Sequence, residues 1–282
     1  MKTGKWTDEE KDYLREHWVK DGSVKVGKAL DRNHRNVGCA ANYLGLRSGW
    51  GDKPRFRHYA VNEDIFKTWS RTSAYLVGLI LTDGNINKGG RAFNIASKDI
   101  ELLEKTRKAF SSEHPITKCP DKDLHILSIG SIAIVRDLEN IGILQNKSKT
   151  LTMPVVPPEY FFDFLRGYID GDGMIVTRPK RGMHLKLSTG SPYILDDISD
   201  IITNMLDIER RNTKTCTGKR RETTSTWYEL SYHGAAAVKI CEAIYSHCDY
   251  LFLSRKYQAF VDYRDRPKNN GLRNNGNATR YK

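Results

Sequence analysis

The sequence predicts an α+β protein in which one structural unit occurs twice, after a small helical domain. Two segments, residues 76–84 and 165–173, look like copies of each other. Each is an apolar run typical of a helix, with a glycine at its third position and Asp-Gly at its end. After each segment, the hydrophobic pattern predicts strands, a helix, a further strand and a helix. This repetition indicates an internal duplication.

The composition narrows the class of protein. The chain has 282 residues, of which 39% are hydrophobic and 28% charged. It contains no apolar run of about 18 residues, so we expect no membrane span. Its N-terminus lacks the apolar stretch of a secretory signal peptide, and its five scattered cysteines are typical of reduced thiols. We therefore expect a protein of the cytoplasm or nucleoid of a bacterium or phage-infected cell, not a secreted one.

The positive charge is concentrated at the two ends of the chain. The formal net charge is +12. Residues 1–58 carry 13 Lys/Arg against 8 Asp/Glu, and residues 264–282 carry 6 against 1. Such a distribution favours a polyanion-binding protein with basic arms. The alternative is a solvated basic surface on an unrelated enzyme.

Residues 1–50 are predicted to form three short helices. Thr7 is a candidate N-cap, and Glu10 three residues later completes a capping box. A second helix is expected near residues 24–30 and a third over residues 37–44. Gly45 is the candidate stop of the third helix.

This arrangement is typical of a helix-turn-helix. Residues 5–10 resemble the opening of Myb/SANT-like DNA-binding domains. In that interpretation the third helix enters the major groove and presents Arg35, Asn36 and Asn42. The alternative is a helical module for dimerisation or protein binding.

Two basic segments are predicted to flank the central region. Residues 51–70 mix glycine, proline, aromatic and basic residues, which suits a linker that contacts DNA phosphates through Arg55 and Arg57. An ordinary surface linker is the alternative. Residues 264–282 form a basic tail rich in asparagine and glycine, which we expect to be disordered.

The central region is predicted to consist of two related halves, residues 71–150 and 151–263. In the first half we expect helices over residues 74–83, 99–110 and 131–140, and strands over residues 91–97 and 124–129. In the second half we expect helices over residues 159–172, 193–206 and 235–246, and strands over residues 174–178, 183–189 and 226–232.

Glycines shape both copies of the repeated segment. Gly78 and Gly167 have no side chain, so two helix backbones can approach closely at these positions. Gly84 and Gly173 can adopt positive φ, which would end each helix sharply. The two helices are therefore expected to pack together and to end side by side.

The two helices would then bring Asp83 and Asp172 together. Two carboxylates at short distance repel each other unless a cation lies between them. Hard oxygen ligands favour Mg²⁺, which can keep coordination positions open for phosphate and water. The pair thus predicts one composite site for divalent metal.

The two segments resemble the paired motifs of the LAGLIDADG homing endonucleases in their single-chain form. Residues 73–86 are similar to the first motif, and residues 146–154 and 164–173 to the approach to the second. The similarity extends over about residues 59–263. It implies two αββαββα halves related by a pseudo-two-fold axis, with antiparallel sheets that form a saddle over DNA and motif helices at the mutual interface.

The resemblance also implies an activity and its partners. It implies a monomeric enzyme of the mobile-intron kind that hydrolyses both strands of a long, pseudo-palindromic or asymmetric DNA target, leaving short 3′ overhangs. Asp83 and Asp172 would bind Mg²⁺, with two or three ions per site, and each would serve one scissile phosphate. An RNA-splicing maturase and a catalytically silent DNA-binding regulator of the same fold are the alternatives.

A third catalytic residue is implied in the first half. Lys98 matches a family position where a lysine polarises water or phosphate, although a solvated lysine before a helix is the alternative. The comparable place in the second half holds Gly190, so either Lys186 substitutes for the lysine or that half works without one. Leu81 also departs from the family, which often has an acid there, as Asp170 is in the second motif.

The strands after the motifs have the pattern of a DNA-reading sheet. No acid occurs between residues 174 and 189, and residues 210–221 hold six cations and no acid. On strand 183–189 the polar side chains alternate with apolar ones, so one face packs on helices and the other meets base edges. Each cation alone is compatible with a solvated surface charge. The predicted DNA contacts are Lys88, Arg91, Asn94, Arg178, Lys180, Arg181, His184, Lys186, Arg220 and Arg221.

Overall fold

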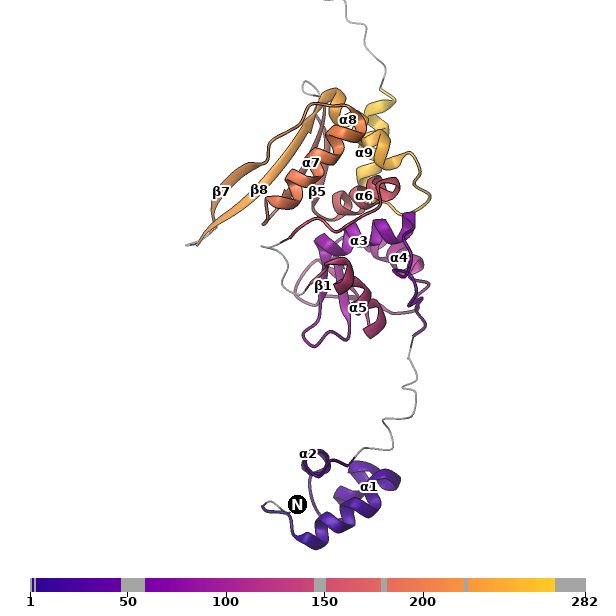
Figure 1. Ribbon diagram of the computed structural model, residues 1–282, viewed down its shortest axis with the longest axis vertical. Helices are drawn as coiled ribbons and strands as arrows, with labels where there is room; N and C mark the ends of the chain where they lie inside the picture. Colours follow the sequence, from indigo (N-terminus) through magenta and orange to yellow (C-terminus); the bar gives the residue numbers. More distant parts are fainter. Residues whose placement is uncertain are drawn as a thin grey trace, which may run out of the picture. The chain divides into compact units, whose positions relative to one another are not determined.

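The computed structural model describes residues 2, 4–46, 59–144, 151–178, 182–220 and 223–266. The chain divides into two compact units, Met1–His58 and Tyr59–Lys282 (Figure 1). Among the described residues, no helix has the length and apolar character needed to cross a membrane.

The described part of the N-terminal unit contains three helical segments, as predicted. The first two belong to α1 (Asp8–Ala29), which is interrupted at Gly22, where φ is 69° and ψ is 173°. The third is α2 (His34–Tyr43), and Gly45 follows it with a φ of +68°, as expected of a helix stop. Leu14, Trp18, Val26, Val37 and Ala41 form the small core of this unit.

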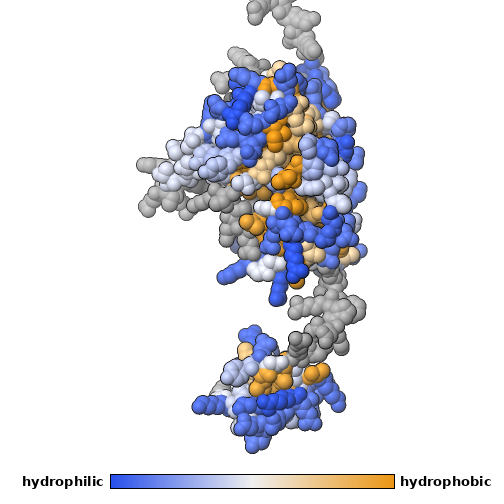
Figure 2. All heavy atoms as spheres, in the orientation of Figure 1, coloured by the Kyte–Doolittle hydropathy of each residue, from blue (hydrophilic) through white to orange (hydrophobic). Residues whose placement is uncertain are grey.

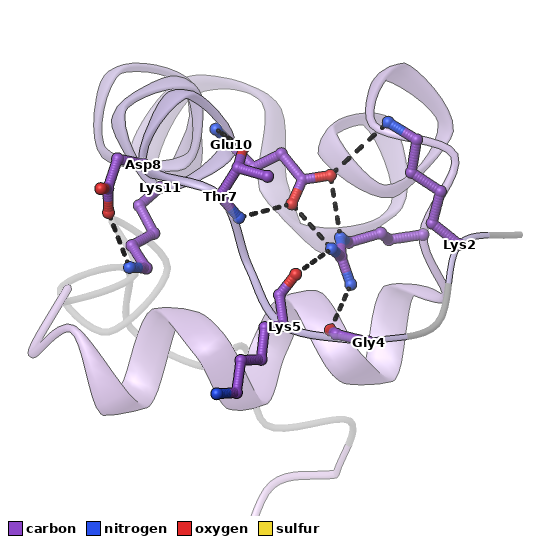
Figure 3. Close-up of polar contacts among 8 residues, drawn as sticks. Lys2, Gly4, Lys5, Thr7, Asp8, Glu10 and Lys11 are labelled. Carbon is purple, nitrogen blue, oxygen red and sulfur yellow. Dashed lines mark hydrogen bonds and ion pairs between the residues drawn. The ribbon is translucent and has the colours of Figure 1, made fainter.

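A capping box and a buried ion pair hold the start of the N-terminal unit (Figure 3). The Thr7 hydroxyl accepts from Glu10 N, and the Thr7 amide donates to the Glu10 carboxylate, which confirms the predicted box. Arg32 donates to the same carboxylate at 2.7 Å and to the carbonyls of Gly4 and Lys5. The arm that precedes α1 is thereby tied to the turn before α2.

The first half of the second unit has the order αββαββα. Its sheet is antiparallel, with the strand order β1-β2-β4-β3. The elements are α3 (Arg71–Asp83), β1 (Gly84–Ile86), β2 (Phe93–Ser97), α4 (Ile100–Ala109), β3 (Ile116–Lys118), β4 (His125–Ile129) and α5 (Ile132–Ile141).

The second half repeats this order and adds one helix. Its sheet has the equivalent strand order β5-β6-β8-β7 and is also antiparallel. The elements are the 3₁₀ turn η2 (Pro158–Tyr160), α6 (Phe161–Asp172), β5 (Gly173–Arg178), β6 (Gly182–Thr189), α7 (Tyr193–Leu206), β7 (Lys214–Arg220), β8 (Thr223–His233), α8 (Gly234–Tyr245) and α9 (Ser254–Arg264). The predicted α+β fold class and internal duplication are confirmed.

Among the described residues, four helices and strands were absent from the sequence prediction. They are the short strands β1 and β3, the strand β7 and the helix α9. Residues 59–70, which fall within the predicted linker, also pack on the second unit. Phe66 is buried in its core, and Lys67 pairs with Asp137 at 2.8 Å.

The two halves share one hydrophobic core. Helices α3 and α6 lie next to each other at the middle of the unit (Figure 1). Every residue from Ser73 to Leu81 of α3 is buried, as is all but one residue of Phe161–Asp170 in α6. This burial on all sides is what the apolar motif runs require, since such a helix cannot leave a face in water.

Candidate active site at the ends of the motif helices

The helices α3 and α6 touch through their backbones. A Cβ atom placed on Gly78 would lie 2.1 Å from Phe164 O, and one placed on Gly167 would lie 2.0 Å from Tyr75 O. No real Cβ can occupy such a position, so both positions require glycine. The predicted role of these two glycines is confirmed.

The glycines that follow the helices act differently from the prediction. Gly84 has a φ of −91° and Gly173 a φ of −85°, so the expected positive φ is wrong at both positions. Glycine is needed here for space instead. A Cβ on Gly84 would lie 2.4 Å from Ile80 O, and one on Gly173 would lie 2.6 Å from Ile169 O. Each chain can therefore turn directly from helix into strand.

The two acids terminate the two helices at the same place. Asp83 is the last residue of α3 and Asp172 the last of α6. A Cβ on Gly171 would lie 1.9 Å from the Thr82 hydroxyl oxygen and 3.3 Å from the Asp83 carboxyl carbon, so the helix ends are in contact. Asp83 is partly buried, whereas Asp172 is exposed. The contact brings the predicted pair together, but in unequal surroundings.

The electrostatics of the pair indicate an excess of negative charge. The pKa of Asp83 is raised to about 7, mainly by burial and in addition by the negative charge of Asp172. The positive charge of Lys256 opposes this rise. A carboxylate in this position is stabilised by any additional cation.

Lys256 of α9 is the site residue that the sequence prediction missed. Its side chain is buried, with a residue exposure of 3%, and its ammonium donates to Ile169 O and to Asp170 O at 2.9 Å. Burial lowers the pKa of Lys256 to about 8, and the charge of Asp170 opposes that change. A lysine in a polar helix carries no sequence signal that distinguishes it from a surface residue.

Asp170 joins the motif helices and does not face the solvent. Its carboxylate accepts from Tyr75 of α3 and from the amide of Leu253, both at 2.8 Å. Burial raises the pKa of Asp170. The first motif has Leu81 at the position where the family often has an acid. In the second motif that position is Asp170, and its carboxylate fixes the helix interface.

The donor set at the helix ends fits a magnesium ion. Among the described residues, no cluster of three or more His, Cys, Asp or Glu side chains forms a metal site. Mg²⁺ needs no such cluster, because it is commonly bound by one or two carboxylates together with water and substrate phosphate. Asp83 and Asp172 would hold it. Metal binding and ion number stay predictions.

The lysine positions differ between the halves. Lys98 is exposed directly after β2, and the neighbouring Asp99 pairs with Arg255 of α9 at 3.1 Å. Gly190, in the comparable second-half place, is exposed. Lys186 forms an ion pair with Glu229 at 2.8 Å. The catalytic role implied for Lys98 stays a prediction.

The alternation predicted for β6 is confirmed. Met183, Leu185 and Leu187 are buried, and the side chains between them are partly exposed on the open face of the sheet. His184 stacks on His233 of β8 with ring centroids 4.2 Å apart.

The remaining predicted DNA contacts fall into three groups. On α2 and in the β1–β2 turn the exposed residues are Arg35, Asn36, Asn42, Lys88 and Arg91. Asn94 is partly buried and its amide donates to the Asn87 side chain at 2.9 Å. Outside the described residues are Arg55, Arg57, Lys180, Arg181, Arg221 and the side chains of Arg178 and Arg220.

Comparison with known protein families finds a match to part of the chain. A model described as a LAGLIDADG-like domain matches residues 159–245, a segment that contains α6 and Asp172. None of the curated proteins matches the chain.

Several solved structures show a distant similarity. The LAGLIDADG homing endonuclease I-LtrWI bound to target DNA shares 15% identity, over 69% of this chain and 88% of its own, with a TM-score of 0.40. I-DmoI in complex with DNA and Ca shares 18%, over 65% and 92%, with a TM-score of 0.42. The N-terminal LAGLIDADG domain of DUF199/WhiA shares 15%, over 67% and 89%, with a TM-score of 0.40.

Proposed function

We propose that the chain is a site-specific endonuclease that cleaves both strands of DNA with a divalent metal. The observation that carries this proposal is the backbone contact of α3 and α6, which joins the ends that bear Asp83 and Asp172. The two acids come from equivalent positions of two equivalent halves. This suits a substrate with two equivalent reacting groups, such as the two strands of a duplex.

In this proposal the two acids and the metal have distinct roles in hydrolysis. Asp83 and Asp172 would hold the metal, and each would place one scissile phosphate at its helix end. When bound, Mg²⁺ stabilises the negative charge that develops on the phosphate and on the leaving oxygen. In each cut the oxygen of water bonds to phosphorus, the bond between phosphorus and the 3′ oxygen breaks, and one proton passes from the water to the 3′ oxygen. The products are a 5′ phosphate and a 3′ hydroxyl.

The other elements would bind and position the duplex. The open faces of the two sheets lie opposite their helix-packed faces, and the turn between β1 and β2 of the first sheet carries the exposed cations Lys88 and Arg91. Helix α2 presents exposed Arg35, Asn36 and Asn42, which suits insertion into a major groove. We therefore propose residues 1–50 as an additional DNA-binding domain that lengthens the recognised site.

The nuclease hypothesis is tested by incubating the full chain with a library of random duplex sites, with Mg²⁺ or with EDTA. Cut sites should be recovered in the presence of Mg²⁺ and not in EDTA. Asp83→Asn and Asp172→Asn should each abolish double-strand cutting while binding to the selected site persists. Asp249→Asn, in an exposed loop after α8, is the matched control and should cut like the wild type.

Other outcomes would support the alternatives. Specific binding without cutting under every divalent metal would contradict the nuclease hypothesis and favour a silent regulator. Binding to structured intron RNA in preference to DNA would favour a maturase. For the N-terminal unit, deletion of residues 1–50 should weaken binding and shorten the DNA footprint, and an unchanged footprint would favour a protein-binding module.

A further inference from the structure

A carboxylate lies at the centre of the open face of the second sheet. Glu229 of β8 is opposite Ser188 of β6 on one side and Lys214 of β7 on the other. Its neighbours Leu230 and Tyr232 along β8 alternate with it and are buried on the core face. Glu229 therefore shares the outward face that the sequence assigned to DNA contact, although that prediction drew on the basic residues of the sheet.

Two donors fix the position of this carboxylate. Lys186 Nζ and Trp227 Nε1 both donate to the same oxygen of Glu229, Oε1, at 2.8 and 2.9 Å. The Trp227 ring lies over Gly218 of β7, where a Cβ would come within 3.0 Å of it. These hydrogen bonds, that of Lys186 foremost, lower the pKa of Glu229. The group is thus an ionised acceptor with a fixed orientation.

The cluster remains accessible from the solvent. The side chain of Lys186 is 26% exposed and that of Glu229 is 21% exposed. The ion pair therefore lies at the surface of the sheet, within reach of a ligand, and is not part of the core. A ligand that approached this face would meet a donor and an acceptor side by side.

An anionic residue on a DNA-binding face has a restricted use. It repels phosphates, so it favours binding only where it meets a hydrogen-bond donor on a base edge. In the major groove a glutamate accepts from N4 of cytosine, and a lysine donates to O6 or N7 of guanine. Lys186 and Glu229 together match the edge of one G·C pair.

We propose that Glu229 and Lys186 read one G·C base pair, with Glu229 on the cytosine and Lys186 on the guanine. Trp227 is a positioning residue that fixes Glu229 through its indole N–H. This inference rests on the proposed DNA binding and names one determinant of its sequence preference.

The test is selection from a randomised duplex library by the full chain in EDTA, followed by sequencing of the bound DNA. The wild type should show a preference for G·C at one position, on the order of 10-fold. Glu229→Gln should lose the cytosine preference at that position and gain adenine, because a glutamine side chain pairs with N6 and N7 of adenine. Preferences at the other positions should not change.

Two further variants separate base reading from other roles. Glu209→Gln removes the same charge from an exposed ion pair with Arg211 and should leave the profile unchanged. Trp227→Phe keeps an aromatic ring but removes the donor, so it should weaken the preference at the same position alone.

Three results would overturn the inference. In one, Glu229→Gln raises affinity for all sequences with an unchanged profile, which means that Glu229 contributes charge alone. In the second, the profile flattens at every position together with a fall in Tm, which means that Glu229 is structural. In the third, the wild type selects specific DNA with no G·C position that responds to Glu229→Gln. If the wild type binds no DNA at all, the proposed function itself fails and this inference fails with it.

Discussion

The ends of α3 and α6 have the same sequence plan but different surroundings. Asp83 is partly buried and its pKa is raised to about 7, whereas Asp172 is exposed. In α3 the Thr82 hydroxyl donates back to Leu79 O at 3.0 Å. In α6 the last carbonyls receive the buried ammonium of Lys256. A duplicated scaffold can thus keep its two acids in place while the support behind each one diverges.

The two sheets also share a plan but differ in detail, in the side chains of their open faces and in strand length. The open face of the first sheet carries neutral groups, such as Asn94 and Ser128, which are paired across β2 and β4. The open face of the second sheet carries the ion pair of Lys186 and Glu229. The strand β8, with 11 residues, is also longer than its counterpart β4, with 5. We expect the second half to contribute more of the sequence discrimination.

The largest loss of stability is expected at the backbone contact between α3 and α6, where the two halves are equivalent. Gly167→Ala places a Cβ 2.0 Å from Tyr75 O, and the helices must separate to admit it. Thermal or denaturant unfolding should show a loss of about 3 kcal/mol or more. Gly130→Ala, where a Cβ would meet no atom within 4 Å, is the matched control and should change stability by less than about 1 kcal/mol. Equal effects of the two variants would contradict the close helix contact.

The second-largest loss of stability is expected at the side chains that support the ends of α3 and α6, because these supports differ between the two halves. Lys256→Met removes the donor to two buried carbonyls and the positive charge near Asp170, so we expect a loss of about 3 kcal/mol. Thr82→Val removes the hydrogen bond from the Thr82 hydroxyl to Leu79 O in α3 and should cost about 1 kcal/mol. Unfolding measurements, with hydrogen exchange of α3 and α6, compare the two. Similar losses would show that the helix ends depend equally on their supports.

A buried cation in the N-terminal unit serves as a reference for Lys256. Arg32 is paired with Glu10, and that hydrogen bond is the main cause that lowers the pKa of Glu10 to about 2. The unfolded value is near 4.5, so the stabilisation is complete above that pH and is lost as the pH falls from 4.5 toward 2.

Hydrogen exchange of α1 and α2 in the full chain measures this dependence. Glu10→Gln should cost about 2 kcal/mol at pH 7 and remove most of the loss between pH 4.5 and 2. Asp12→Asn, in an exposed pair with Arg15, is the control and should have little effect. If the loss of stability at acid pH persists in Glu10→Gln, other carboxylates are its cause.

The sequence predicted those features that local patterns encode. The period of two along β6 identified its buried face, and the repeated apolar runs identified α3, α6 and their terminal acids. Gly78 and Gly167 were interpretable because an absent side chain within an apolar helix implies close packing. At Gly84 and Gly173 the same reasoning gave the wrong cause, since the clash with the carbonyls of Ile80 and Ile169 depends on the path that the chain takes after each helix.

The missed features depend on contacts between distant segments. The sequence of helix α9 is largely polar, so it does not indicate a buried helix. The burial of Lys256 arises only where α9 meets the end of α6. The strand β7 was interpreted as a run of cations because its alternation is polar on both faces. Glu229 gained its significance from Lys186 and Trp227, and the register of β6 against β8 decides that contact.

Strand-resolved cleavage tests the central claim most directly. A duplex that contains a selected site, with a different label on each strand, is followed in time with Mg²⁺ for the wild type, Asp83→Asn and Asp172→Asn. If the two acids form one composite site, the wild type cuts both strands, at unequal rates because the acids differ in burial, and neither variant makes a double-strand break. Double-strand cutting that persists in either variant, or that persists in EDTA, would contradict the account.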